Sequence, residues 1–168
     1  MKVRSLLIQS CVLCIIVPFI VYGVAIFKAV NMHASCIGYF KMAADANSVN
    51  IAEKHLSTGI KYLEENNLTS GSTKIFIYDP TDDLGLWYEN LKSAQDNLQK
   101  LNAKEELTEL EESNALMKLR ETLLSAEGSV THPFMISFYP AHIAWTFVLW
   151  LIWLLWGLAP LFYYLAKE

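Results

Sequence analysis

Tryptophan residues near the carboxyl end have a spacing that indicates a binding role. Trp150, Trp153 and Trp156 recur at three-residue steps in the middle of a long apolar stretch. Tryptophan that only anchors a helix in a membrane belongs at the two interfaces, so these positions indicate another use. The three rings and the small Gly157 could dock another membrane protein, although packing against lipid or the first apolar stretch explains them equally well. Gln9 in that first stretch adds a polar group that favours a partner on another helix.

A weaker candidate for ligand contact lies in the middle of the chain. Trp87 and Tyr88 belong to one predicted helix, and Arg120 belongs to the next one. A pocket between these two helices could bind a ligand, with the Arg120 guanidinium as the contact for an anion. An ordinary interhelical ion pair of Arg120, or a snorkelling Arg120 side chain, is the alternative.

The sequence indicates no metal site, no cofactor site and no catalytic group. Its four histidines form neither Glu-x-x-His nor His-x-x-x-His on one helix face. Asp79, Asp82 and Asp83 lack the spacing of a calcium-binding loop and are better explained as turn and capping residues. Neither a glycine-framed nucleophile turn nor a glycine-rich phosphate loop occurs. We therefore expect a protein that is not an enzyme.

The three cysteines do not form a disulfide framework. Cys11 and Cys14 are spaced like a redox pair, but both lie in the first apolar stretch, where small apolar thiols are typical packing residues. Cys36 stands alone beyond that stretch. It is expected to be a free thiol or, less often, a bridge to another chain.

Charge is distributed unevenly along the chain. Residues 32–139 contain nine lysines and arginines against sixteen aspartates and glutamates, an excess of seven negative charges. An acidic domain argues against nucleic acid as a partner, because phosphate recognition needs a clustered basic face. Lys2 and Arg4 precede the first apolar stretch, and this bias predicts that both termini are cytoplasmic.

Two apolar stretches, residues 5–27 and 143–166, are each long enough to cross about 30 Å of hydrocarbon as a helix. The first also resembles a cleavable signal peptide, with Tyr22-Gly23-Val24-Ala25 as the cleavage region. Because the chain contains it from Met1, we expect an uncleaved signal-anchor. The predicted organisation is a cytoplasmic stub (1–4), a first transmembrane helix (5–27), an extracytoplasmic domain (28–142), a second transmembrane helix (143–166) and a second cytoplasmic stub (167–168).

Three helices are predicted in the domain from apolar residues at alternating three- and four-residue steps. The first span is expected to continue as one helix to about Glu65, where Asn66-Asn67 ends it. The second helix is expected to start with Thr81 as its N-cap. The expected buried stripes are Met42, Ala46, Val49, Leu56, Ile60 and Leu63 on the first helix, and Leu84, Trp87, Leu91, Ala94, Leu98 and Leu101 on the second.

The third helix is predicted from about Lys104 to Ala126, with Gly128 closing it. Thr108 and Glu111 stand at capping-box spacing near its start. Its expected apolar positions are Leu107, Leu110, Leu116 or Met117, Leu119, Leu123 and Leu124, with a slip in phase near Ser113 and Asn114.

Two short segments, residues 74–78 and 130–139, are predicted to be extended and could pair as a small β ribbon. The predicted fold class is therefore mainly α, with two transmembrane helices flanking an extracytoplasmic three-helix antiparallel bundle that carries this ribbon. The plan resembles that of bacterial sensor ectodomains in architecture. Such receptors need a cytoplasmic output domain, and the two stubs predicted here are too short to contain one.

These observations favour a non-catalytic accessory, scaffolding or assembly subunit of a membrane protein complex. The bilayer is its expected surrounding, and another membrane protein or further copies of the chain are its expected partners. An extracytoplasmic ligand-binding or sensing module that signals through a partner protein is the alternative. The domain would be periplasmic if the source is bacterial.

Overall fold

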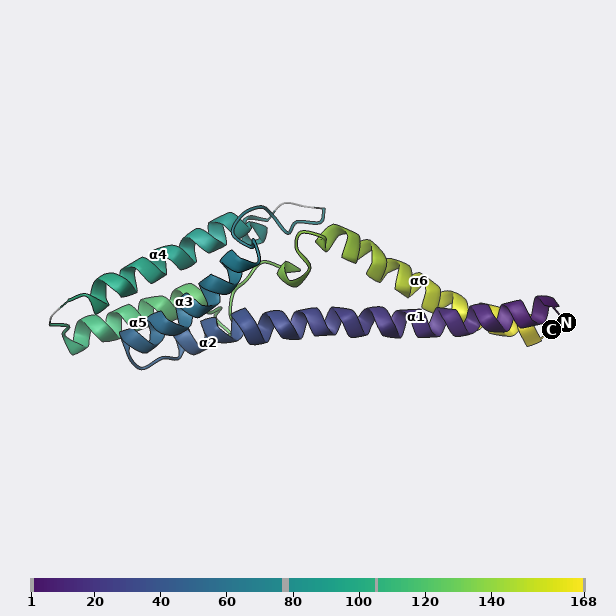
Figure 1. The fold of residues 1–168 in the computed structure, drawn as a ribbon, viewed down its shortest axis with the longest axis horizontal. Coiled ribbons are helices and arrows are strands. Elements are labelled where there is room, and N and C mark those ends of the chain that lie inside the picture. The colour runs from purple at the N-terminus through teal and green to yellow at the C-terminus, as the bar shows by residue number, and fades with distance from the viewer. Residues whose placement is uncertain (1, 77–78, 105, 168) are drawn as a thin grey trace. The chain divides into compact units, whose positions relative to one another are not determined.

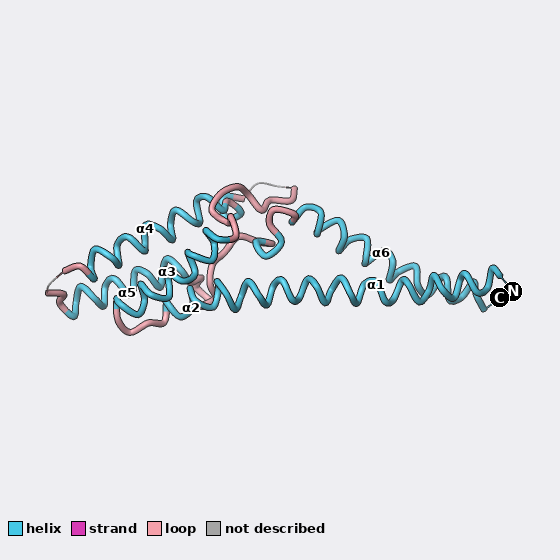
Figure 2. The backbone as a smooth tube through the Cα atoms, in the orientation of Figure 1, coloured by secondary structure: helices cyan, strands magenta, loops and turns pink. Residues whose placement is uncertain are grey.

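The computed structural model describes the backbone of residues 2–76, 79–104 and 106–167, and this part of the chain is mainly helical and contains no strand (Figures 1 and 2). The chain divides into two compact units. The terminal unit comprises residues 1–30 and 140–168, and the central unit comprises residues 31–139. The predicted mainly α fold class is confirmed at this level.

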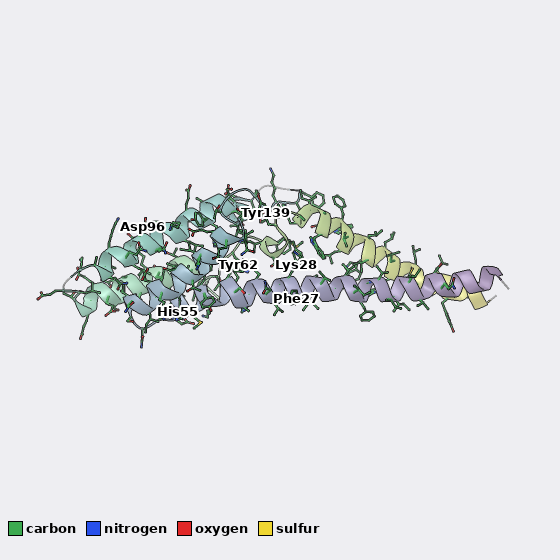
Figure 3. The ribbon with its side chains drawn as sticks, viewed as in Figure 1. Phe27, Lys28, His55, Tyr62, Asp96 and Tyr139 are labelled. Atoms are coloured by element: carbon green, nitrogen blue, oxygen red, sulfur yellow. The ribbon has the colours of Figure 1, made fainter. Side chains whose placement is uncertain are left out.

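Two long apolar helices, α1 (Lys2–Met32) and α6 (His142–Lys167), form the terminal unit, except that the last two residues of α1 belong to the central unit. By length and composition, Val12–Ala44 and His142–Leu161 are long and apolar enough to cross a membrane. Only 11% of the most apolar window of the first and 6% of that of the second is buried, whereas the core helix of a soluble protein is mostly covered. Phe27, near the end of α1, is an example of a large exposed apolar side chain (Figure 3).

The helix that begins with α1 continues through a short π-helix, His33–Ile37, into α2, Gly38–Ala44. The prediction that it continues to about Glu65 is wrong, because the helix stops after Ala44. A new helix, α3 (Val49–Glu65), starts where the Ser48 hydroxyl accepts a hydrogen bond from the backbone N–H of Ile51. Asp45, Asn47 and Ser48 all favour turns and helix caps, and this cluster was the signal for the break.

The end of α3 agrees with the prediction. Asn67 has φ of 56°, the left-handed conformation that asparagine tolerates better than most residues. The N–H of Leu68 donates to the carbonyl of Leu63 at 2.8 Å, and the N–H of Asn67 donates to that of Glu64 at 3.2 Å. This paired arrangement is the Schellman motif, and it satisfies carbonyl groups that the helix end would otherwise leave open.

The residue that caps the start of α4 (Leu84–Asn102) differs from the predicted one. Thr81 does not cap it. The carboxylate of Asp83 accepts a hydrogen bond from the N–H of Leu86 at 3.0 Å and is the N-cap. Asp79 instead caps a short 3-10 helix, Pro80–Asp82, by accepting from the N–H of Thr81. Asp79 and Asp83 of the acidic cluster thus serve as successive helix caps.

The third predicted helix, α5, spans Glu109–Leu123 and is shorter than expected at both ends. The predicted capping box is confirmed, because Thr108 and Glu111 exchange side-chain and backbone hydrogen bonds at its start. Its end is set by an isolated β bridge between Leu124 and Val130, which closes a tight turn containing Gly128 with φ of 78°.

The predicted ribbon is not found among the described residues. Residues 77–78 lie outside them, and Ile136–Phe138 forms a 3-10 helix where an extended segment was expected. The two short pairings that do occur are the isolated bridges Ser72 to Asp83 and Leu124 to Val130, each within its own connection. Neither bridge joins the described residues of one predicted segment to those of the other.

Four α-helices, α2 to α5, contribute to the core of the central unit, where the sequence predicted three. The difference arises because the first predicted helix is divided into α2 and α3. In the described structure α3 packs against both α2 and α4, while α5 packs against α2, α4 and α3. Along the predicted stripes, Leu56, Ile60, Leu63, Leu84, Leu91, Leu98, Leu119 and Leu123 are buried, whereas Met42, Leu110 and Met117 are exposed.

Phe40 occupies the centre of this core and is fully buried. Its ring lies edge-on to the Trp87 ring, with centroids 5.7 Å apart and an interplanar angle of 87°. Gly59 lets α3 approach this ring, since a Cβ atom there would lie only 2.8 Å from Phe40 Cδ1. The Cys36 thiol donates to the Gly59 carbonyl at 3.6 Å and is buried, so it is not positioned to bridge another chain.

Candidate functional site

The three candidate tryptophans of α6 do not share one environment. Trp150 and Trp153 are 72% and 67% exposed, although both are large apolar side chains. Trp156 contacts α1, with its ring centroid 6.2 Å from that of Phe19 and 5.6 Å from that of Tyr22. Successive residues of an α-helix are turned by about 100°, so the three-residue steps move the rings progressively around α6.

The face of α6 opposite Trp150 is buried within the terminal unit. Ile152 is 2% exposed, and Cys14, Pro18 and Ala25 are buried side chains of α1 in the same unit. The exposed Trp153 packs on Trp156, which contacts α1: the two tryptophan ring centroids lie 6.3 Å apart in an edge-to-face arrangement. Among the ring contacts of the described residues, Trp156 is the α6 tryptophan that packs on α1, and Trp153 packs on Trp156.

The other predicted docking residues lie in open positions. A Cβ atom built on Gly157 would meet nothing within 4 Å, so no neighbour in the described structure approaches this glycine closely. Gln9 is exposed on α1. Both residues are thus available at the surface of the terminal unit, in line with a role toward another chain or toward lipid.

The residues predicted to contact a ligand in the central unit are used separately. The indole N–H of Trp87 donates to the carbonyl of Thr131 at 3.0 Å. The hydroxyl of Tyr88 donates to the Glu64 carboxylate at 2.7 Å. Arg120 is exposed, and its guanidinium lies 3.7 Å from a carboxylate oxygen of Asp45, which is the interhelical ion pair given as its alternative.

Tyr88 belongs to a polar ladder between α3 and α4. The hydrogen bond to Glu64, with burial and the nearby carboxylate charge, raises the pKa of Tyr88 to about 12. Lys92 lies 3.9 Å from Glu64 and donates to Gln95, whose side chain donates to Ser57. These contacts join the two helices.

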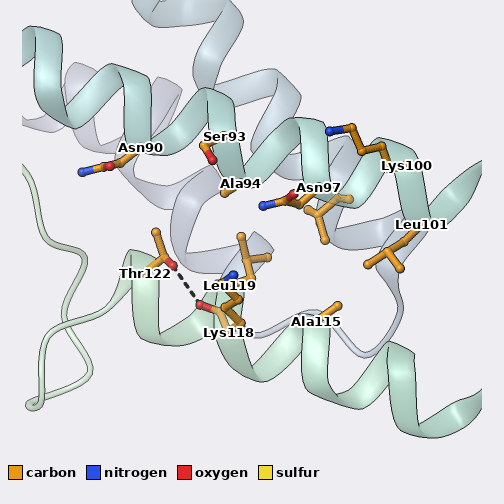
Figure 4. Close-up of a pocket in the computed structure, with 11 residues that line it drawn as sticks. Asn90, Ser93, Ala94, Asn97, Lys100, Leu101, Ala115, Lys118, Leu119 and Thr122 are labelled. Carbon is orange, nitrogen blue, oxygen red and sulfur yellow. Dashed lines mark hydrogen bonds between the residues drawn. The ribbon is translucent and has the colours of Figure 1, made fainter.

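A groove of about 430 Å³ lies between α4 and α5 (Figure 4). Leu98 and Leu119 are the buried residues of its lining, and Ala94 and Ala115 are the small ones. The full lining consists of Asn90, Ser93, Ala94, Asn97, Leu98, Lys100, Leu101, Ala115, Lys118, Leu119 and Thr122. Its volume is in the range of binding sites, which is roughly 300 to 1,000 Å³ for small-molecule ligands.

A second cavity of about 280 Å³ adjoins the groove. Asn90 and Thr122 line both spaces, so the cavity continues the groove toward the start of α4. Trp87 lines this second cavity together with His132. Neither Tyr88 nor Arg120 lines either space, so the structure does not bring the three predicted ligand contacts together.

Sequence reasoning missed the groove residues. Asn90, Asn97, Lys100 and Lys118 read as an ordinary polar surface, because each belongs to a helix face next to a leucine stripe. The available signal was the pair of alanines, Ala94 and Ala115, in otherwise leucine-rich stripes, since small side chains leave space between helices.

Among the described residues, no group of three or more His, Cys, Asp and Glu side chains could hold a metal ion. Comparison with protein-family models, with curated proteins and with solved structures finds no match to this chain. The two candidate sites of the described structure are the outward face of α6 and the groove between α4 and α5.

Proposed function

We propose that this protein is a non-catalytic accessory, scaffolding or assembly subunit of a membrane protein complex. In this proposal α1 and α6 cross the bilayer, both termini are cytoplasmic, and the central unit is extracytoplasmic. The basic residues Lys2 and Arg4 and the acidic composition of residues 32–139 support that orientation.

The observation that carries the proposal is the exposure of Trp150 and Trp153 on α6. Contact with lipid tails needs only apolar side chains, which leucine supplies equally well. Indole rings add broad, rigid contact area and ring-packing energy, which are the properties of anchor residues at protein interfaces. Because Trp156 already packs α6 against α1, the exposed pair is available for a second protein.

The test replaces the exposed pair, Trp150→Leu with Trp153→Leu, and measures which membrane proteins copurify with the tagged chain in mild detergent. Leucine keeps the hydrophobicity that insertion needs, so membrane insertion should remain unchanged while partner recovery falls. The matched control is Trp156→Leu, which removes a ring from the contact with α1 and should leave partner recovery close to that of the parent. Unchanged recovery in the double variant, or no partner with the parent chain, contradicts the proposal.

A ligand-binding or sensing module that signals through a partner is the second candidate function. The groove between α4 and α5 favours it, because its lining combines apolar side chains with several amides and hydroxyls. A small molecule that raises the melting temperature of the full chain, and does not do so for the Asn97→Trp variant, would support this function.

A further inference from the structure

The groove between α4 and α5 has a shape that could bind a helix. Its lining follows α4 at Asn90, Ala94, Asn97 and Leu101, which are steps of four, three and four residues. The same spacing occurs on α5 at Ala115, Leu119 and Thr122. Residues at these steps form one face of a helix, and two such faces side by side leave a channel that accepts the ridge of a third helix.

The length of the groove sets the length of its occupant. From Asn90 to Leu101 the axis of α4 rises about 16 Å at 1.5 Å per residue, which is about three turns of a docked helix. Ala94 and Ala115 provide depth, because their side chains are short. A docked helix would therefore place two or three apolar side chains against Leu98, Leu101 and Leu119.

The charge of the groove differs from that of the domain around it. The central unit is acidic overall, yet the lining contains Lys100 and Lys118 and no aspartate or glutamate. In the described part of the chain, neither ammonium group lies within ion-pair distance of a carboxylate. The groove thus presents an apolar floor bordered by two cations, which complements an acidic amphipathic surface.

We propose that this groove binds an acidic amphipathic helix of another protein. Its apolar residues would pack on the leucines of the floor, and its carboxylates would form ion pairs with Lys100 and Lys118. The amides of Asn90 and Asn97 would form hydrogen bonds with polar side chains at the edge of the docked helix. The site is separate from the exposed tryptophans of α6, so the two proposals stand or fall independently.

A second copy of this chain is a poorer occupant. The most acidic start among the described helices is that of α5, and two of its three first-turn carboxylates are already in use. Glu111 lies 2.8 Å from Lys104 and completes the capping box, and Glu112 accepts a hydrogen bond from the N–H of Val49 at 2.9 Å. Freeing these groups to bind a second groove would undo contacts that hold α3 and α5 in place.

The experiment places a photo-crosslinking amino acid at Asn97 of the full chain in cells that naturally make it, and identifies the crosslinked peptides by mass spectrometry. Asn97 lines the groove (Figure 4), whereas Asp96, the control position, is exposed and is not part of the lining (Figure 3). The expected product at position 97 is a segment of one other protein, with several acidic residues and apolar residues at three- and four-residue steps. The same product should be absent from position 96.

Charge reversal then tests the recognition. Lys100→Glu with Lys118→Glu should reduce both the crosslink and the affinity of a synthetic peptide of the captured segment by about tenfold or more, because like charges would face each other. Lys54→Glu, an exposed lysine of α3 outside the groove, should change affinity less than about twofold. Changing the carboxylates of the peptide to lysines should restore binding to the reversed groove.

Folding of each variant is checked by its melting temperature and helix content, and a variant that unfolds is replaced by Asn97→Trp, which fills the exposed side of the groove. Four results would overturn the proposal: no crosslink at position 97, a crosslink to this chain itself, a lipid or small-molecule adduct, or a captured segment without acidic residues. Equal effects of the double variant, Lys100→Glu with Lys118→Glu, and of Lys54→Glu would overturn it as well.

Discussion

At the scale of single residues, Gly59 and Phe40 determine how closely α3 approaches α2. We expect Gly59→Ala to destabilise the central unit, because the added methyl group overlaps the Phe40 ring and Trp87 covers the edge of that ring. Overpacking a core costs about 1–3 kcal/mol, against a gain of up to about 1 kcal/mol when alanine replaces glycine within a helix. The melting temperature of the full chain in detergent should fall accordingly.

The control for this prediction is Thr58→Ala, the neighbouring exposed position on α3, which should leave the melting temperature nearly unchanged. A smaller side chain at position 40 gives a sharper check. In the Phe40→Leu background the cost of Gly59→Ala should shrink, because the two positions touch and their effects are then not additive. Equal costs in both backgrounds would show that the methyl group is accommodated elsewhere.

The exposed tryptophans show what a residue pattern leaves open. Their type and their position in an apolar stretch were visible in the sequence. Which of them faces outward was not, because that depends on the face of α6 that Phe19 and Tyr22 of α1 cover. These contacts join residues more than a hundred positions apart, so the spacing of residues within α6 cannot reveal them.

At the scale of elements, the start of α5 depends on Glu111. Its hydrogen bond with Lys104, followed by those with Thr108, lowers the pKa of Glu111 to about 2 from 4.5. A lowered folded pKa means that this carboxylate stabilises the folded helix start fully above pH 4.5, and that the stabilisation is lost as pH falls through about 2. At neutral pH, Glu111→Gln should therefore fray the first turn of α5.

Amide hydrogen exchange in that turn is the measurement. Exchange should be faster in Glu111→Gln than in the parent at pH 5, and the difference should diminish toward pH 2 as the parent becomes protonated. Glu109→Gln is the matched control, since it lies in the same turn and makes no hydrogen bond to Lys104. A difference between Glu111→Gln and the parent that persists unchanged at pH 2 would rule out this titration.

The helices themselves could be predicted where one face repeats without interruption. Leu84, Leu91 and Leu98 keep a seven-residue step, and all three are buried. Leu110 was expected to be buried and is 71% exposed, because α5 begins only at Glu109 and the apolar phase slips before Leu119. Each helix boundary depends on a single capping residue. At the start of α4, Thr81 and Asp83 are equally plausible caps when only the sequence is considered.

The groove between α4 and α5 was beyond sequence reasoning for a different reason. A cavity is set by the distance between two helices, and that distance depends on all the side chains packed between them. Ala94 and Ala115 are ordinary helix residues when each helix is considered alone. Only their position in the same lining shows that together they leave open space.

At the scale of the whole molecule, the proposed orientation makes opposite labelling predictions for the central unit and the termini. A cysteine in place of exposed Lys100 should react with a membrane-impermeant maleimide in intact cells. Cysteines in place of Lys2 or Lys167 should react only after permeabilisation. The native Cys36 is buried and should contribute little background. Labelling of the Lys100 variant only after permeabilisation would reverse the orientation.

The contact between Glu112 and Val49 also has a consequence for the order of folding during synthesis. The carboxylate that binds the first turn of α3 is made 63 residues after Val49, and the Gly128 carbonyl that accepts from Lys41 is made later still. Helices α2 and α3 therefore leave the ribosome before these partners exist, and Val49 must wait about 3 to 13 seconds for Glu112 at 5 to 20 residues per second. Closure of the domain coincides with synthesis of α6, so the second apolar helix emerges as the fold that precedes it is completed.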